Sequence, residues 1–344
     1  MSTIQQNILE KIEQSHTILI VSSRPADPDC IGSNLALRWF IEEKYNKYCD
    51  SVIFGGLTER VEWIPEVEKV EHRFIGEFDF NKYDLIISVD GSHWDRVFQD
   101  NFKKRVLPTI SEFNFVGIDH HEKGDISTEL PETFLQKTEV SCSKVIYDYF
   151  IKNSGLEITP LVATWLYAGL VDDTGRFTYD ITPQTFNFAA ELLKLGADHK
   201  LCVNEAYQLE QIEFTAWAIY HTEFNEEIKT SILVITNELS EELNGKFGNN
   251  WERKIIGLHY NETVMRRAKN FDYGIFFQLD FRNGGVRTGW RTRNYGNQIS
   301  VREVLEKMGF EAGGHFGAGG GYSKTADISK VRDEFVELMK NRVY

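Results

Sequence analysis

The stretch that decides the fold reads Phe115-Val116-Gly117-Ile118-Asp119-His120-His121. Its apolar part predicts a buried strand, and an aspartate followed by two histidines stands at the carboxyl end of that strand. Burying three titratable side chains is costly unless hydrogen bonds or a bound cation compensate for the lost water. A divalent metal ion is the usual partner for such a group, although strand ends also collect polar residues in ordinary turns.

Two other apolar runs of the β type are also followed by carboxylates. Residues 17–21 precede a loop that carries Asp27 and Asp29, and a helix is expected to start directly after this loop. Residues 84–89 are followed at once by Asp90. Each segment alone is explained by a turn or a helix cap, in which aspartate and proline are common.

A fourth acidic segment follows an apolar helical stretch. Residues 166–171 end in Asp172 and Asp173, which precede Thr174 and Gly175. In an open parallel sheet, ligands bind outside the carboxyl ends of the strands. The joint pattern of three strand ends and this helix end therefore favours one shared site over four independent caps.

In these segments the chain resembles the DHH phosphoesterase superfamily. The first motif of that family is matched by residues 27–33, the second by Asp90, the third by residues 119–121 and the fourth by residues 169–175. The motifs stand in the order that the family has. The resemblance therefore covers the N-terminal half of the chain with several specific matches.

A further resemblance lies near the C-terminus. Residues 313–320 are similar to the glycine-rich signature of the DHH-associated C-terminal domain, and residues 291–293 resemble the element that precedes it. The resemblance implies a substrate-binding domain with these candidate contacts: Arg291, Arg293, Gly313, Gly314 and His315. Arginine forks suit phosphate oxygens, and glycines let backbone amides approach an anion. Trp290 or Tyr295 is a candidate for stacking on a base, while an exposed hairpin with solvated charge is the alternative interpretation.

The resemblance also implies hydrolysis of a phosphoester with two metal ions. Asp27 would bind one ion, Asp29 and His120 the other, Asp90 both, and Asp173 would complete the metal-binding set. Asp90, His120 and His121 would be the catalytic residues, with His121 facing the phosphate or orienting a neighbour. Oxygen ligands with one or two imidazoles suit Mn²⁺ or Mg²⁺, and two such ions offset the repulsion among the converging carboxylates.

One position departs from the first motif of the family. The motif opens with a metal-binding histidine, and alignment on Asp27 and Asp29 places Ser23 there. Serine is a poor ligand for manganese or magnesium. We therefore expect one metal site to be weaker, filled by water or completed by another residue, for which His93 and Asp172 are candidates.

Composition limits the partners of the chain. Its 344 residues suit two domains, and its formal net charge is −14. Because an acidic surface repels a long polyanion, we expect a short nucleotide substrate and no long nucleic acid. No apolar run approaches the roughly 18 residues of a membrane span, and the N-terminus lacks a signal-like core. No membrane partner is expected, and a homodimer is expected from the resemblance alone.

The cysteines bear on the compartment. Cys30, Cys49, Cys142 and Cys202 have neither the spacing of a zinc site nor an evident pairing. Free thiols in a reducing cytoplasm are the simplest interpretation. Cys30 and Cys142 are interpreted as plain core or loop residues.

The order of the segments predicts the fold class α/β: an N-terminal domain with a parallel sheet and helices on both faces, a helical connector, and a smaller mixed α/β C-terminal domain. The expected boundaries are 1–180 for the DHH metal-binding domain, 181–225 for the connector and 226–344 for the substrate-binding domain. Further strands are predicted at 51–54, 231–235 and 273–279, and helices at 31–44, 94–104, 142–153, 184–195, 299–308 and 328–339.

The sequence thus predicts a metal-dependent phosphoric ester hydrolase acting on oligoribonucleotides, linear dinucleotides or 3′-phosphoadenosine 5′-phosphate. Two alternatives stay open: a nucleotide-binding protein whose metal site is weakened or inactive at Ser23, and a RecJ-like single-strand exonuclease. The acidic net charge disfavours the exonuclease. Retention of the aspartates disfavours an inactive site, because such a site would gain stability by losing buried charge.

Overall fold

The computed structural model describes residues 3–57, 60–98, 102–111, 114–178, 181–204, 212–248, 251, 264–265, 268–280, 284–293, 300–315, 317–324 and 327–341. The chain divides into two compact units, Met1–Gln208 and Leu209–Tyr344. Part of the predicted connector belongs to each unit, with α7 (Pro183–Lys194) and α8 (His199–Asn204) in the first and α9 (Ile212–His221) in the second. The predicted domain boundaries and domain roles stay predictions.

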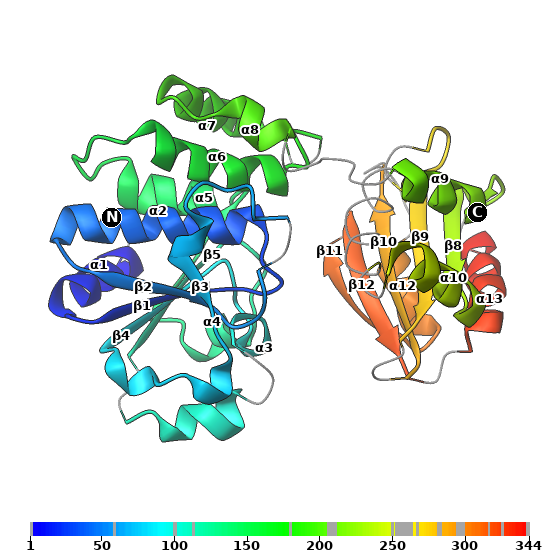
Figure 1. The fold of residues 1–344 in the computed structure, drawn as a ribbon, viewed down its shortest axis with the longest axis horizontal. Coiled ribbons are helices and arrows are strands. Elements are labelled where there is room, and N and C mark those ends of the chain that lie inside the picture. Colours follow the sequence, from blue (N-terminus) through cyan, green and yellow to red (C-terminus); the bar gives the residue numbers. More distant parts are fainter. Residues whose placement is uncertain are drawn as a thin grey trace. The chain divides into compact units, whose positions relative to one another are not determined.

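Within the described residues, the first unit has a six-stranded parallel sheet (Figure 1). Its strands are β1 (Ile18–Ser22), β2 (Cys49–Ile53), β3 (Val70–His72), β4 (Leu85–Val89), β5 (Phe115–Asp119) and β6 (Phe134–Gln136). They lie in the order β3-β2-β1-β4-β5-β6, and every neighbouring pair is parallel. The predicted parallel sheet is confirmed.

Helices cover both faces of this sheet, because its central strands are apolar at successive positions. In β1, Ile18 and Ile20 pack into the core on one face, whereas Leu19 and Val21 pack into the core on the other. The first core includes residues of α1 (Thr3–Gln14), α2 (Pro28–Tyr45), α5 (Cys142–Ile146) and α6 (Pro160–Asp173). The second core includes residues of α3 (Trp94–Val97) and α4 (Asp125–Glu129).

The strand order reverses between β1 and β4. From β1 the chain continues outward through β2 to β3, and then returns to β4 on the other side of β1. At such a switch point the connections leave the sheet in opposite directions, so a crevice opens at the carboxyl ends of the two central strands. The loops that follow β1 and β4 therefore lie where a ligand is expected to bind.

Two glycines of the predicted motifs let helices pack closely beside these loops. α2 packs against α6 (Figure 1), and a side chain at Gly32 would lie 2.2 Å from the backbone oxygen of Trp165. A side chain at Gly169 would lie 2.2 Å from Oδ1 of Asp29. Glycine is therefore needed at both positions for close packing and not for an unusual backbone angle.

Two predicted helices differ from the structure. The helix predicted over 94–104 is interrupted, because α3 ends at Val97 and Phe98 is extended. The extended backbone lets Phe98 stack on Phe102, with ring centroids 3.9 Å apart. The helix predicted over 142–153 starts at Cys142, but after Ile146 it continues as a π-helical turn. Helix α1 was not predicted, since it buries only a narrow apolar face.

The second unit has its own mixed sheet, whose described strands are β7 (Glu223–Asn225), β8 (Thr230–Ile235), β9 (Tyr273–Leu279), β10 (Val286–Thr292), β11 (Glu311–His315) and β12 (Ala318–Ser323). The strand order is β11-β12-β10-β9-β8-β7, and only the β8–β9 pair is parallel among these strands. One core of this unit includes residues of α12 (Val301–Lys307) and α13 (Ile328–Lys340), and another includes α10 (Asn237–Phe247). The predicted fold class is confirmed.

The glycine-rich segment near the C-terminus forms strands. β11 and β12 pair antiparallel, with Gly314 opposite Gly319. A side chain at Gly319 would lie 2.1 Å from the Trp290 ring, which is buried in the core of the second unit. The suggestion that Trp290 stacks on a base is therefore wrong, and Tyr295 lies outside the described residues.

No helix among the described residues is long and apolar enough to cross a membrane.

Candidate metal centre

The predicted metal-binding residues come together at the switch point of the first unit. Asp27 is the N-cap of α2, Asp29 lies in the first turn of that helix, and Asp90 directly follows β4. The remaining members are the last residue of β5 with the two histidines after it, and the last residue of α6: Asp119, His120, His121 and Asp173. We call these seven residues the Asp–His cluster.

Three groups of candidate metal ligands lie within the cluster or beside it. In each group the ligand atoms all lie within 4.8 Å of one another. The groups are Asp29, His120 and Asp173; Asp27, Cys30 and Asp90; and Asp90, Asp119, His120 and His121. Because Asp90 and His120 each belong to two groups, the group with Asp119 and His121 adjoins both of the others.

Asp29 is held by the start of helix α5. Its Oδ2 accepts a hydrogen bond from the backbone nitrogen of Cys142 at 2.6 Å, and its Oδ1 accepts one from that of Ser143 at 2.9 Å. The hydroxyl of Ser143 also donates to Oδ1. The first amides of a helix lack partners within the helix, so a carboxylate there is both fixed and stabilised. This contact fixes Asp29 beside Nε2 of His120, which is 3.9 Å from its Oδ2.

Asp90 is held in an unusual backbone conformation. Its φ angle is 57°, in the left-handed region, and its side chain is only 2% exposed. Its Oδ1 is buried and accepts no hydrogen bond from the described residues. Such strain is typical of functional sites, and a buried carboxylate oxygen without a hydrogen-bond donor fits a cation ligand.

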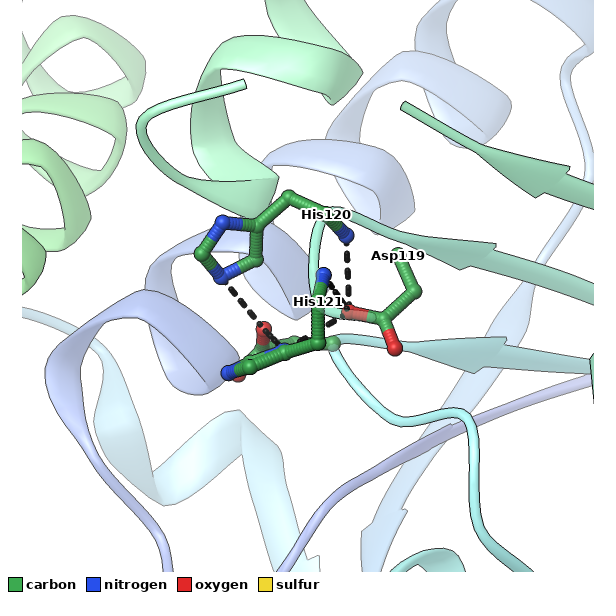
Figure 2. A group of neighbouring side chains, drawn as sticks. Asp119, His120 and His121 are labelled. Atoms are coloured by element: carbon green, nitrogen blue, oxygen red, sulfur yellow. Dashed lines mark hydrogen bonds and ion pairs between the residues drawn. The ribbon is translucent and has the colours of Figure 1, made fainter. Parts of the chain in front are cut away.

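Asp119 orients both histidines (Figure 2). Its Oδ1 accepts hydrogen bonds from the backbone nitrogens of His120 at 2.7 Å and His121 at 3.2 Å, and from the ring Nδ1 of His121 at 2.9 Å. Burial raises the pKa of Asp119, but the hydrogen bond and charge of His121 outweigh burial, and the net pKa is lowered. Burial lowers the pKa of His121, but the bond to Asp119 outweighs it and the net pKa is raised.

His120 presents one ring nitrogen to the carboxylates. Its Nδ1 lies 3.1 Å from the carbonyl oxygen of Glu139, so Nδ1 carries the proton and donates it there. Nε2 faces Oδ2 of Asp173 at 3.2 Å and Oδ1 of Asp90 at 3.5 Å. Burial, followed by the charge of His121, lowers the pKa of His120 and favours the neutral ring. A lone pair then faces two carboxylates, which is favourable only with a cation between them.

Two of the carboxylates have strongly raised pKa values. Burial, followed by the charge of Asp29, raises the pKa of Asp90 and of Asp173 well above the ordinary value. Within the described residues, Oδ2 of Asp173 also has no hydrogen-bond donor. Carboxylate oxygens, an imidazole nitrogen and unpartnered buried acceptors are the donor set that a hard divalent cation requires. The residues present therefore fit a metal ion.

The two residues considered as substitutes for Ser23 lie in different surroundings. Asp172 is paired with Arg60, whose terminal nitrogen lies 2.8 Å from Oδ1 and 3.0 Å from Oδ2. Burial raises the pKa of Asp172 to about 6 although the charge of Arg60 lowers it. His93 is exposed, and its Nδ1 lies 3.5 Å from Asp125. Among the described residues, neither His93 nor Asp172 belongs to a ligand group, whereas Cys30 does.

The contacts that Cys30 and Arg60 make beside the cluster were not predicted. Cys30 is buried in the core, as predicted, and it also forms a ligand group with Asp27 and Asp90. Arg60 stands in a segment without a motif, so no sequence signal connects it with Asp172. The amides that fix Asp29 are 113 and 114 residues away, which no local pattern reveals.

The predicted substrate-binding residues lie in the second unit. Arg291 lies in β10 and is half-buried. It donates a hydrogen bond to the backbone oxygen of Trp290 at 2.8 Å. Arg293 is exposed and donates to the backbone oxygen of Phe271 at 3.5 Å. Gly313, Gly314 and His315 form the end of β11. Their role in substrate binding stays a prediction.

Removal of metal ions is expected to destabilise the first unit, and more so at high pH. Asp90, Asp172 and Asp173 have raised pKa values, so the folded protein binds more protons than the unfolded chain above the ordinary value of 3.8. The free energy of unfolding of the metal-free protein therefore falls as the pH rises through this window, which for Asp172 ends at about 6. His121 acts in the same direction, because its raised pKa makes its stabilising charge disappear as the pH rises.

Thermal unfolding can test this expectation. The increase in Tm from chelator-treated protein to protein with Mn²⁺ should be larger at about pH 8 than at about pH 5. Magnesium should act in the same direction, and potassium at equal ionic strength serves as the control for general salt effects. Equal increases at both pH values would contradict a cluster of carboxylates that repel one another without metal.

Comparison with known proteins places these residues in a family. Residues 17–170 match the family model described as DHH family, N-terminal domain. A probable bifunctional oligoribonuclease and PAP phosphatase, NrnA, of Streptococcus mutans is 29% identical over 225 residues, which cover 61% of this chain and 67% of that protein. The bifunctional oligoribonuclease and PAP phosphatase NrnA of Mycoplasma genitalium is 24% identical over 344 residues, which cover 98% of this chain and 97% of that protein.

One solved structure shares the fold across nearly the whole chain. The crystal structure of an exopolyphosphatase-related protein from Bacteroides fragilis matches with a TM-score of 0.78, at 18% identity. The match covers 98% of this chain and 96% of that chain. The range of the family model holds the Asp–His cluster up to His121, and Asp173 lies just beyond it. The comparisons thus relate this chain to the DHH family through its N-terminal part, residues 17–170.

Proposed function

We propose that this chain is a metal-dependent phosphoric ester hydrolase that acts on short nucleotides. The observation that carries the proposal is the group of buried acceptors without donors, Nε2 of His120, Oδ1 of Asp90 and Oδ2 of Asp173, at the switch point of a DHH domain. Relatives with similar sequences are named as oligoribonucleases and PAP phosphatases, or as a cyclic-di-AMP phosphodiesterase. These names support a substrate with one or a few nucleotides.

The Asp–His cluster suggests which residues would hold each of the two ions. Asp29, His120 and Asp173 would hold one ion, Asp27 would hold the other, and Asp90 would contact both. Two bound cations would supply charge neutralisation and a water activated for in-line attack on phosphorus. We assign Mn²⁺ or Mg²⁺ to these positions because most of the ligand atoms are carboxylate oxygens.

The second histidine of the cluster, His121, has a separate role. The hydrogen bond from Nδ1 to Asp119 fixes the ring of His121, and its raised pKa favours the protonated form. The side chain is 41% exposed, so a ligand can reach part of it. We assign His121 to the phosphate, where it stabilises negative charge as water adds and the ester bond breaks. The leaving oxygen takes up a proton, and phosphate or a nucleotide departs.

The direct test is release of mononucleotide. Purified protein with Mn²⁺ and a 5′-phosphorylated RNA dinucleotide should release mononucleotides, and chelation should stop the reaction. Release of phosphate from 3′-phosphoadenosine 5′-phosphate is the parallel assay for a phosphatase. Activity that is unaffected by exhaustive chelation would refute the proposed metal dependence.

The length of the RNA substrate should affect the rate of hydrolysis more than the salt concentration does. At equal concentrations of 5′ ends, we expect the dinucleotide to react at least about tenfold faster than single-stranded RNA of about 20 nucleotides, because a net charge of −14 repels a long polyanion. The rate on the dinucleotide should change little with added salt, since few phosphates are contacted. A preference for the long strand, with a steep salt dependence, would favour the RecJ-like alternative.

A nucleotide-binding protein with a weakened metal site is the second candidate, favoured by Ser23 alone. Counting bound Mn²⁺ at saturation separates the two. Two ions per chain support the hydrolase, whereas fewer than two together with nucleotide binding and no turnover support the binding protein. The predicted homodimer and cytoplasmic location stay predictions.

A further inference from the structure

One of the two proposed ion positions lacks a nitrogen ligand. The position formed by Asp29, His120 and Asp173 has an imidazole, whereas the position formed by Asp27 and Asp90 has Ser23 where the family motif has histidine. Carboxylates alone leave this second position dependent on water. A further donor from the protein would have to lie close to both aspartates.

Cys30 lies where such a donor is needed. Its Sγ is completely buried and, with ligand atoms of Asp27 and Asp90, forms a group in which all atoms lie within 4.8 Å of one another. Sγ also donates a hydrogen bond to the backbone oxygen of Ser23 at 3.6 Å, so the thiol points toward the residue that replaces the histidine. The backbone nitrogen of Cys30 donates to Oδ1 of Asp27 at 2.9 Å, which fixes these two residues relative to each other.

The surroundings supply a second, independent sign of a cation. The carboxylate of Asp90 is 2% exposed, and its Oδ1 is buried and accepts no hydrogen bond within the described part of the chain. Nε2 of His120 and Nδ1 of His121 each lie 3.5 Å from this oxygen, but neither forms a hydrogen bond with it. All four cysteines are buried, but only Cys30 belongs to a ligand group in the described residues.

We propose that Cys30 binds, as a thiolate, the ion that Asp27 and Asp90 hold, and so takes the place of the missing imidazole. This inference rests on the proposed function, because it assumes that the cluster holds metal. On binding, the thiol releases its proton to solvent and the sulfur forms a bond to the ion. A soft sulfur ligand shifts the preference of this position from Mn²⁺ and Mg²⁺ toward Co²⁺, Zn²⁺ or Fe²⁺. The two ion positions would then differ in the metal that they prefer.

Cobalt substitution tests the inference without any assay of activity. Metal-free protein is titrated with Co²⁺, while the near-ultraviolet absorption that arises from a thiolate–cobalt bond is followed together with the number of bound ions. The wild type should show this band as one of two ions binds. Cys30→Ala should lose the band and bind that ion at least about tenfold more weakly, while keeping the ion at the histidine position. Cys202→Ala, which removes an equally buried thiol outside the ligand groups, should behave as the wild type.

The possible results separate the inference from the proposed function. Two cobalt ions bound without the band would overturn the role of Cys30 and leave the hydrolase proposal intact. A band that persists in Cys30→Ala would also overturn it, because another thiol would then be the ligand. No binding of cobalt, manganese or zinc would overturn both proposals. If Cys30→Ala does not fold, X-ray absorption at the cobalt edge of the wild type decides, since the inference requires one sulfur scatterer.

A compensating variant provides an independent check. Ser23→His restores the residue that the family motif has at this position, so the double variant Ser23→His/Cys30→Ala should bind two ions again without the thiolate band. Its preference should move back toward Mn²⁺, measured as the ratio of the Mn²⁺ and Co²⁺ affinities. A double variant that binds no better than Cys30→Ala would contradict the view that the two side chains serve the same ion.

Discussion

Asp90→Asn is expected to lower kcat/KM for a short nucleotide at least about a thousandfold while making the metal-free protein more stable. Asp90 belongs to two ligand groups, so its replacement weakens both ion positions. Without metal, the Asp90 carboxylate is buried and repelled by Asp29, which the raised pKa of Asp90 reflects. Removing such a charge is expected to raise the free energy of unfolding by about 1–4 kcal/mol.

Asparagine is the suitable substitution at this position. Asp90 has a φ angle of 57°, which asparagine tolerates and alanine does not, so the variant isolates the charge from the backbone. Asp95→Asn is the matched control, because Asp95 is an exposed carboxylate on α3. Denaturation with urea in chelator and assays with saturating Mn²⁺ measure the two effects. A variant that loses activity and also loses stability would indicate a structural role for Asp90.

Asp29→Ala is expected to have the second largest effect, on stability and on activity together. The variant leaves the amides of Cys142 and Ser143 buried without an acceptor, at a cost of about 1–3 kcal/mol for each donor. It also removes a carboxylate from the group with His120 and Asp173. We therefore expect a loss of about 3 kcal/mol in the free energy of unfolding and of about a thousandfold in kcat/KM.

The variant Ser141→Ala separates the role of Asp29 in holding the start of α5 from its role as a metal ligand. The hydroxyl of Ser141 is the N-cap of α5 and accepts from the backbone nitrogen of Lys144 at 3.2 Å, but it is not a member of a ligand group in the described residues. Its removal should cost about 1 kcal/mol of stability and leave the number of bound ions unchanged. If Ser141→Ala reduced metal binding as strongly as Asp29→Ala, the effect of Asp29 would be attributed to α5 and not to the ion.

Much of the first unit could be predicted from its sequence, because the signals are local. Mostly apolar runs such as 85–89 indicate a strand buried on both faces, and a carboxylate directly after the run marks its end. Parallel strands place those ends at one edge of the sheet, which brings Asp90 near Asp119 without any knowledge of distances. The resemblance to the DHH family added the order of the motifs.

What the sequence could not reveal depends on contacts between distant segments. Asp172 is paired with Arg60, which is 112 residues away in the sequence. The pattern of apolar and polar residues along the chain does not indicate such a pair. The glycine-rich segment was predicted to bind an anion, and one of its glycines, Gly319, also makes room for the ring of Trp290. The end of α3 was missed because the residues after Val97 carry no glycine or proline that would mark a helix end, although Phe98 is extended in the structure.

The contact of Asp29 with the start of α5 has a consequence for the protein during its synthesis. The amides that fix this carboxylate are 113 and 114 residues further along the chain, and Asp173 follows later still. A nascent chain on the ribosome therefore has its first aspartates outside long before the remaining ligands emerge, at roughly 5–20 residues per second. An ion held by Asp29, His120 and Asp173 would be captured only after β5 and α6 have packed beside α2. Metal loading would then follow the assembly of the first unit and would not guide its early steps.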